Sequence, residues 1–323
     1  MRATAVNLTL TPFIVAIACA AVQVQAQPWP SKTVRFIVAS SPGGVPDIAA
    51  RMLADRFSRT LSGTFVVENM MGGGGLLGAQ TVSRAAPDGH TIWMATSTHL
   101  TSNPYMFKSL PYDPARDYDP VALLISSGFV FAVNADLPVK NIEDLVALAK
   151  SRPGKLNYAS TSPRGAAGIV GEWFNHVAGT RILQIPYKTT AQAAQDTAGG
   201  VTQMIIISLG VVAPFVQAGR IRVIGVNSSR RHPDLPDVRL LSETFPGFVL
   251  DSWLALVVPR GTPREIVQKL NRVANEFIRE PRTGKGDAYF TVGSGSAEEV
   301  AEFIRKDREL WGKITRTLNI EPE

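Results

Sequence analysis

The chain has 323 residues, of which 45% are hydrophobic and 19% are charged. It can therefore bury one large core or two moderate ones, and its composition excludes a disordered protein. The formal net charge is +6, but the basic residues are scattered among acids and no basic run carries interleaved aromatic residues. This pattern gives no support to nucleic-acid binding and leaves a weak preference for anionic solutes.

The N-terminal segment has the pattern of an export signal. Arg2 is followed by an uncharged stretch with its apolar centre at residues 13–22, and the stretch ends at Val24-Gln25-Ala26. Small residues at that position are typical of a signal peptidase site, and the apolar centre is shorter than a membrane span. We predict a signal peptide at residues 1–26 that is cleaved after Ala26. A retained membrane anchor is the alternative.

The single cysteine of the chain, Cys19, lies inside this segment. The mature chain would therefore have no thiol, which excludes disulfides, thiolate catalysis and zinc–sulfur sites. Lipid attachment at Cys19 is a further alternative, although Ala16 stands where a large aliphatic residue is expected.

Apolar runs typical of strands alternate with helical patterns along the rest of the chain. The expected strands are 32–39, 64–68, 91–95, 129–133, 155–159, 181–186, 201–207, 222–226 and 253–258. The expected helices are 47–61, 77–85, 142–152, 166–177, 191–198 and 211–218, followed by two that begin at capping boxes, Thr262 with Glu265 and Ser296 with Glu299. The proline-rich segment 101–120 is expected to be a surface loop. This order predicts an α/β fold whose mostly parallel sheets are flanked by helices.

Polar loops follow several of the expected strands. In open α/β sheets, ligands bind beyond the carboxyl ends of strands, where helix N-termini offer free N–H groups and a partial positive charge. Hydroxyl donors and close-approaching glycines at such places suit a carboxylate or phosphate. One loop alone is equally well explained by helix capping, so the prediction of a cleft depends on all of them. The loops are Ser40-Ser41-Pro42-Gly43-Gly44, Thr96-Ser97-Thr98-His99, Ser160-Thr161-Ser162 and Tyr187-Lys188-Thr189-Thr190.

The glycine run at residues 73–78 matches the dinucleotide-binding pattern G-x-G-x-x-G. No acid lies about twenty residues further on, and the run follows the second strand of its unit instead of the first. A tight turn that packs a helix on the sheet is therefore the favoured interpretation. Of the four histidines, only His99 lies near an expected cleft loop, and a packed or surface histidine is the alternative there.

The patterns of common hydrolases and metalloenzymes are missing from the sequence. It contains no H-E-x-x-H, no H-x-x-x-H and no G-x-S-x-G. We therefore predict no catalytic residues, no metal and no cofactor.

With these loops located, the sequence resembles the tripartite tricarboxylate transporter receptors, also called Bug solute-binding proteins. The resemblance covers nearly all of the mature chain, and its markers are specific in their order and spacing. They are Trp29-Pro30-Ser31-Lys32, Pro42-Gly43-Gly44, Val66-Val67-Glu68-Asn69, Ala86-Pro87-Asp88-Gly89, Leu110-Pro111-Tyr112-Asp113-Pro114, Asn157-Tyr158-Ala159-Ser160, Pro186-Tyr187-Lys188, Leu235-Pro236-Asp237 and Gly261-Thr262-Pro263.

The resemblance implies a periplasmic-binding-protein fold, in which two lobes close on a ligand like a hinged trap. Lobe 1 would comprise residues 27–128 and 250–323, and lobe 2 residues 129–249. The implied ligands are small carboxylates, including di- and tricarboxylates, acidic amino acids and aromatic acids. The implied partner is a membrane transporter of the same type, and the implied location is the periplasm. A monomer is expected.

The sequence departs from the family near residues 199–208. Two acids that are usual there are absent, which favours a less polar ligand. Arg164 could pair with a second carboxylate, or it could face solvent. Trp253 is expected either to wall the cleft or to pack in the core.

The sequence and the resemblance together predict an extracytoplasmic receptor for a small organic acid. A sensory protein that presents the solute to a membrane sensor is one alternative, and an exported hydrolase using the same cleft is another. The predicted ligand-binding residues are Ser41, Gly43, Gly44, Asp47, Thr96, Ser97, Thr98, Ser160, Thr161, Arg164, Tyr187, Ile207 and Ser208.

Overall fold

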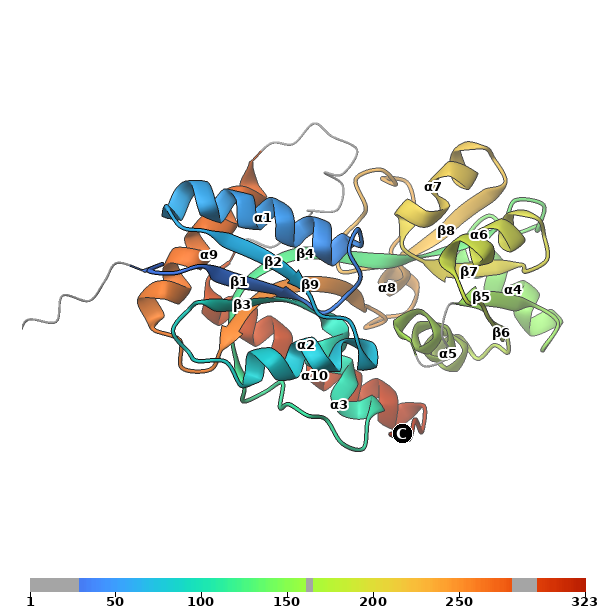
Figure 1. The fold of residues 1–323 in the computed structure, drawn as a ribbon. Helices are drawn as coiled ribbons and strands as arrows, with labels where there is room; N and C mark the ends of the chain where they lie inside the picture. Colours follow the sequence, from blue (N-terminus) through green and yellow to red (C-terminus); the bar gives the residue numbers. More distant parts are fainter. Residues whose placement is uncertain (1–28, 161–164, 281–294) are drawn as a thin grey trace, which may run out of the picture.

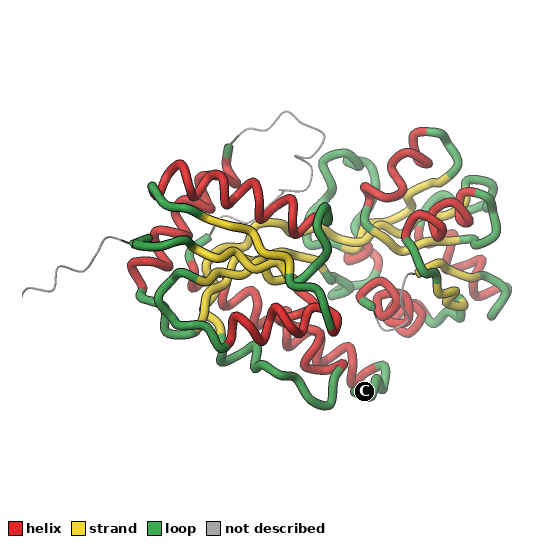
Figure 2. The backbone as a smooth tube through the Cα atoms, viewed as in Figure 1, coloured by secondary structure: helices red, strands yellow, loops and turns green. Residues whose placement is uncertain are grey.

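The computed structural model describes residues 29–160, 165–280 and 295–323, and these fold into two lobes (Figure 1). The predicted signal peptide lies outside the described residues. In both lobes helices cover the two faces of a central sheet, as Figure 2 shows most clearly for lobe 1. The two-lobed α/β fold expected from the sequence is thus confirmed, but its sheets are mixed, with parallel and antiparallel strand pairs, and not mostly parallel as expected.

Lobe 1 is built mainly from the two ends of the chain. Its sheet has the order β2-β1-β3-β9-β4, where β4 is Tyr118–Asn134. Strand β1 pairs in parallel with β2 and β3, while β9 runs antiparallel to β3 and β4. Its elements are β1 (Val34–Val38), α1 (Val45–Leu61), β2 (Phe65–Asn69), a short turn η1 (Gly73–Gly75), α2 (Leu76–Ser83), β3 (Thr91–Thr96), a wide helical turn η2 (Thr98–Ser102), α3 (Asn103–Met106), β9 (Asp251–Pro259), α9 (Arg264–Arg279) and α10 (Ala297–Thr317).

Lobe 2 is built from the middle of the chain. Here β5 pairs in parallel with β6 and β7, while β7 and β8 run antiparallel to β4. Its elements are α4 (Ile142–Ser151), β5 (Asn157–Ser160), α5 (Ala166–Ala178), β6 (Leu183–Pro186), α6 (Thr190–Ala198), β7 (Met204–Ile207), α7 (Leu209–Gln217), β8 (Ile221–Asn227) and α8 (Leu241–Thr244).

The long strand β4 (Tyr118–Asn134) belongs to both sheets. Its residues 118–128 pair with β9 and its residues 129–134 pair with β7 and β8. Gly128 stands at the change of partner, next to Asp251 of β9, and a side chain there would collide with the carbonyl oxygen of Asn227. The chain therefore passes between the lobes once within β4 and returns between β8 and β9.

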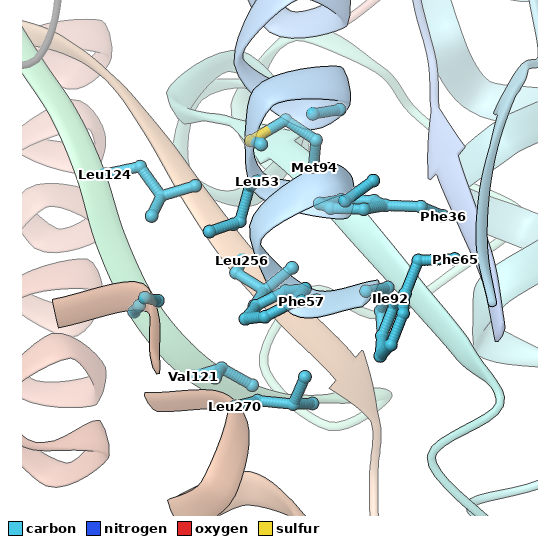
Figure 3. Packing of buried hydrophobic residues seen from close by; sticks show 14 of the residues in the cluster. Phe36, Leu53, Phe57, Phe65, Ile92, Met94, Val121, Leu124, Leu256 and Leu270 are labelled. Carbon is cyan, nitrogen blue, oxygen red and sulfur yellow. The ribbon is translucent and has the colours of Figure 1, made fainter. Parts of the chain in front are cut away.

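Separate cores stabilise the two faces of each sheet. One lobe 1 core lies between the sheet and helices α1 and α9, where Leu53 and Phe57 of α1 pack with Phe36 and Leu270 (Figure 3). Burial of such large apolar side chains contributes about 1.5–3 kcal/mol each to folding. The C-terminal half of α10 packs against lobe 2, because Trp311 belongs to a hydrophobic core of that lobe. Helix α10 thus connects the two lobes in addition to the two crossings of the chain.

The structure corrects two local predictions. The segment 101–120, expected to be a loop, contains α3 and the beginning of β4. The capping box at Thr262 does not form, because Pro263 occupies the N-cap of α9 and the Thr262 hydroxyl donates to the carbonyl oxygen of Pro259 at 2.7 Å. The box at Ser296 is confirmed, with 3.1 Å from the Glu299 N–H to the Ser296 hydroxyl and 2.7 Å from the Ser296 N–H to the Glu299 carboxylate.

A candidate solute-binding cavity between the lobes

A cavity of about 410 Å³ lies where β4 and β9 pass between the lobes. This volume is in the range of sites that hold small molecules. Lobe 1 and the crossover contribute Val45, Pro46, Thr96, Thr98, Ile125, Gly128, Phe129, Ser252, Trp253 and Leu254. Lobe 2 contributes Ala159, Ser160, Ala166, Ala167, Thr190, Ala193, Ile205, Ile206, Ile207 and Ser208.

Helix N-termini from both lobes meet at this cavity. Val45 and Pro46 begin α1, Ala166 and Ala167 begin α5, and Ser208 is the N-cap of α7. Within the described residues, no side chain accepts a hydrogen bond as the N-cap of α1, α5 or α7. The N–H groups at the start of a helix carry a partial positive charge, so these ends attract an anion.

The described lining carries no formal charge. Its polar side chains are all hydroxyls, and the rest of the lining is apolar apart from Gly128. An anion in this cavity would therefore be held by helix ends and hydroxyl groups, with no countercharge from a described lining residue. The hydroxyls belong to Thr96, Thr98, Ser160, Thr190, Ser208 and Ser252.

The loop between β1 and α1 is braced by the buried carboxylate of Asp47. This carboxylate accepts from the Gly43 N–H at 2.9 Å, from Arg51 Nε at 3.0 Å and from Asn69 Nδ2 at 2.9 Å. Burial opposes its ionisation, but the Arg51 guanidinium and the N–H of Gly43 more than offset this, so the pKa of Asp47 lies below its usual value of 3.8. Asp47 thus fixes the loop and stays ionised.

Two of the predicted donors of this first loop, the N–H groups of Gly43 and Gly44, are used within the loop itself. The Gly43 N–H is bonded to Asp47, and the Gly44 N–H points to the carbonyl oxygen of Ser41 at 3.4 Å. Ser41, Gly43, Gly44 and Asp47 do not line the cavity, whereas the next residues, Val45 and Pro46, do. The expectation that Gly43 offers its N–H to a ligand is wrong for this geometry, because Asp47 already holds that N–H.

The loop after β3 divides into cavity-facing and buried residues. Thr96 and Thr98 line the cavity, while Ser97 is buried and its carbonyl oxygen accepts from the Thr101 hydroxyl at 2.7 Å. His99 is also buried, with Nδ1 2.9 Å from the Thr96 hydroxyl. Burial lowers the pKa of His99 to about 4, so its ring is neutral at pH 7. The neutral ring holds the Thr96 hydroxyl through its Nδ1 atom.

The glycine run packs against this histidine. Gly75 has a φ of +92°, and a Cβ atom there would collide with Nε2 of His99. A Cβ atom on Gly78 would stand 2.8 Å from Cβ of Ala39 at the end of β1. The run is therefore a tight turn that lets α2 approach the sheet, which is the interpretation favoured from the sequence.

Lobe 2 places Ser160, Ile207 and Ser208 on the cavity wall. The Ser160 hydroxyl also accepts from Gln184 Nε2 at 2.6 Å. Tyr187 is outside the lining, because its hydroxyl donates to the Asp196 carboxylate at 2.9 Å and its ring packs on a lobe 2 core. The predicted residues Thr161 and Arg164 lie outside the described residues.

Trp253 serves both of the roles considered for it. It lines the cavity, yet only 1% of its surface is exposed, and its Nε1 donates to the Asp307 carboxylate at 3.1 Å. Burial raises the pKa of Asp307 to about 6, and nearby Asp251 adds to this effect. The carboxylate thus anchors the indole from the side away from the cavity.

Sequence reasoning missed several lining residues for two reasons. Ala166, Ala167 and Thr190 begin helices and could have been found by extending the loop argument by one or two residues. Phe129 and Ser252 lie on the crossover strands, next to the lobe bounds that the family resemblance implied, but no local sequence pattern indicates that the two residues meet.

The described residues show no sign of a metal or of a membrane span. Over residues 29–160, 165–280 and 295–323, no group of His, Cys, Asp or Glu is placed to hold a metal ion. The helices of the same residues all fall short of the length and apolar character needed to cross a bilayer.

Comparisons with known proteins agree with this architecture. Residues 49–320 match the family described as tripartite tricarboxylate transporter family receptor. A protein of Bordetella bronchiseptica from the group named UPF0065 is 34% identical over 320 residues, which covers 98% of this chain and 94% of that relative. Protein BugT of Bordetella pertussis is 29% identical over 315 residues, covering 96% of each chain.

A solved structure gives the same result in three dimensions. The R. palustris protein Rpa4515, solved with adipate, is 30% identical and superposes with a TM-score of 0.76. The match covers 91% of this chain and 100% of that one. The chain therefore belongs to the tripartite tricarboxylate transporter receptor family, whose Bug-type members are solute-binding proteins and not enzymes.

Proposed function

We propose that this receptor captures a small organic acid, a mono- or dicarboxylate, in the cavity between its lobes. The observation that carries the proposal is the meeting of the N-termini of α1, α5 and α7 at a cavity whose described lining is uncharged. A carboxylate fits this arrangement because helix N–H groups and hydroxyls are donors without bulk. The related Rpa4515 was solved with adipate, a dicarboxylate, which supports the same class of ligand.

The receptor would then deliver the acid in the periplasm to a membrane transporter of the tripartite tricarboxylate type. In this proposal residues 1–26 direct export and are removed after Ala26, and the mature protein is a monomer. Its lobes comprise residues 27–128 with 250–323, and residues 129–249. Delivery to a membrane sensor is the second candidate, and pull-down of detergent-solubilised membranes with the liganded protein distinguishes the two by the partner recovered.

Thermal shift of the periplasmic protein against a panel of acids tests the proposal. The panel spans mono-, di- and tricarboxylates, aromatic acids and amino acids, with NAD and neutral sugars as controls. A ligand at 100 times its dissociation constant stabilises the folded protein by about 2.7 kcal/mol, which is a clear shift. A shift with acids alone supports the proposal, and a shift with NAD or sugars alone contradicts it.

A pair of variants at Ala167 locates the binding site. Ala167 is the second residue of α5 and lines the cavity, so Ala167→Asp adds a negative charge where the acid would bind. An acid near a helix N-terminus is tolerated by the fold. We expect Ala167→Asp to abolish the shift, while Ala167→Asn, of similar size but neutral, keeps most of it. Equal binding by both variants would place the acid elsewhere.

A further inference from the structure

Part of the cavity wall is hydrocarbon. It is made by the end of β7, which reads Ile205-Ile206-Ile207, together with Phe129, Trp253 and Leu254 from the crossover strands. Ile207 ends β7 and is, at 8%, the most exposed of the three isoleucines. Its side chain is therefore the one best placed for contact with a solute.

Asp47 and Asp196 lie near the cavity, but their carboxylates are hydrogen-bonded to other parts of the protein. Asp47 is bonded to Gly43, Arg51 and Asn69, and Asp196 accepts from Tyr187 and from Gln192. None of these side chains lines the cavity.

The acids behind the crossover do not line the cavity either. Asp307 accepts from Nε1 of Trp253, and Asp251 accepts from the Ser229 hydroxyl at 2.8 Å through one oxygen, while its other oxygen is buried with no hydrogen-bond partner among the described residues. The described lining thus offers hydroxyls and hydrocarbon, but no negative group that would pair with a cation.

From this wall we infer that the receptor selects acids with a hydrocarbon body and no amino group, and that Ile207 determines this specificity. The inference rests on the proposed function and deepens it. An α-ammonium group carried into the cavity would lose its water and meet no described carboxylate. Burial of an unpaired charge of this kind costs several kcal/mol, so an amino acid should bind at least about 100-fold more weakly than the same acid without the amino group.

Matched ligand pairs test the inference on the unmodified protein. Adipate is compared with 2-aminoadipate, and 3-phenylpropionate with phenylalanine, by isothermal titration. Within each pair the carboxylates and the carbon skeleton are the same, so the amino group is the only difference. We expect the member without the amino group to bind at least about 100-fold more tightly in any pair that binds. Equal or tighter binding of the amino acids overturns the inference.

Substitution of Ile207 tests the residue that we assign. Ile207→Asp places a carboxylate on the hydrocarbon wall, and Ile207→Asn is the neutral control of the same shape. The Asp variant should reduce the preference against the amino group by about tenfold or more, because a paired ammonium no longer carries the full burial penalty. The Asn variant should keep the preference. If both variants retain it to the same degree, Ile207 is not the determinant.

The outcomes separate this inference from the proposed function. If amino acids, or only acids rich in hydroxyl groups such as gluconate, shift the protein, it is a receptor for acids but the inference is wrong. If no acid of any kind shifts it, the proposed function fails and the inference fails with it. Folding of both variants is checked by circular dichroism before titration.

Discussion

The two lobes stabilise the same kind of strand-to-helix loop in different ways. In lobe 1, the carboxylate of Asp47 sits at the start of α1, takes up the Gly43 N–H and offsets the positive end of the helix. The described residues show no side-chain cap at the start of α1, α5 or α7, and all three starts line the cavity, but in lobe 2 no described carboxylate is bonded into the loop before α5 or α7. Lobe 1 thus supplies a braced rim with the hydroxyls of Thr96 and Thr98, and we expect lobe 2 to supply most of the attraction for an anion. Similar loops in one sequence can therefore have unequal roles.

The largest expected effect is the loss of stability when the glycine turn beside His99 in lobe 1 is disturbed. Gly75→Ala forces a side chain onto a φ of +92° and into Nε2 of His99, and we expect a loss of about 3 kcal/mol of unfolding free energy. Gly74→Ala is the matched control, because its φ is +67° but no atom lies within 4 Å of its Cβ position. It should lose about 1 kcal/mol. Urea unfolding measures both, and equal losses would show that His99 does not press on the turn.

The brace at Asp47 should act only while its carboxylate is ionised. The folded-state pKa lies below 3.8, so its contribution is present above that pH and disappears as the pH falls through the folded value. We expect Asp47→Asn to lower the free energy of unfolding by about 2 kcal/mol at pH 7. In strong acid the variant and the original protein should be equally stable. Urea unfolding from pH 7 down into strong acid measures this difference in unfolding free energy.

The same Asp47→Asn variant sharpens the comparison of the lobes. Because it removes a negative charge beside the cavity, acid affinity should stay the same or rise. A large loss of affinity would show that lobe 1, and not lobe 2, holds the anion.

The carboxylate behind Trp253 should show the opposite dependence on pH. The pKa of Asp307 is raised to about 6, so the folded protein binds its proton more tightly than the unfolded chain and loses stability as the pH rises from about 4 to 6. Asp307→Asn keeps a bond acceptor for the Trp253 indole and should be more stable than the original by about 2 kcal/mol at pH 7. The two proteins should be equal at pH 4. A difference that does not change with pH would contradict this account.

The smallest expected effect concerns one hydroxyl of lobe 1. Thr98→Val removes a cavity hydroxyl and preserves the shape, so acid binding should weaken by about fivefold. Thr33→Val, which also replaces an exposed threonine but lies outside the lining, should bind as before. Isothermal titration with the best-binding acid measures both, and an unchanged Thr98→Val would remove this hydroxyl from the site.

Local patterns in the sequence predicted most elements of the fold. Helix α4 begins after Asn141 as expected, because the side chain of Asn141 accepts the N–H of Asp144 at 2.8 Å. The same logic failed at Thr262, because the following proline takes the N-cap and its hydroxyl turns back to Pro259. Capping patterns near a proline are therefore weaker evidence than isolated ones.

Local sequence patterns did not predict the full length of β4 or which distant residues meet at the cavity. Strand β4 runs from Tyr118 to Asn134 through bulges and two sheets, whereas only residues 129–133 had a clear strand pattern. The cavity wall joins Phe129 with Trp253, which are brought together by strand pairing that local periodicity does not contain. Ser160 was predicted from a polar loop that follows a strand, which is a local property, whereas Ile207 and Ser208 were predicted from the family resemblance around residues 199–208.

The most direct test of the account is a crystal structure of the periplasmic protein grown with the acid that gives the largest thermal shift. We predict electron density for the acid in the cavity, with its carboxylate at the N-termini of α5 and α7 and its hydrocarbon body against Ile207 and Phe129. Density at another surface, or a carboxylate bound only by the loop of Ser41 to Gly44, would contradict the central claim that the cavity between the lobes is the binding site.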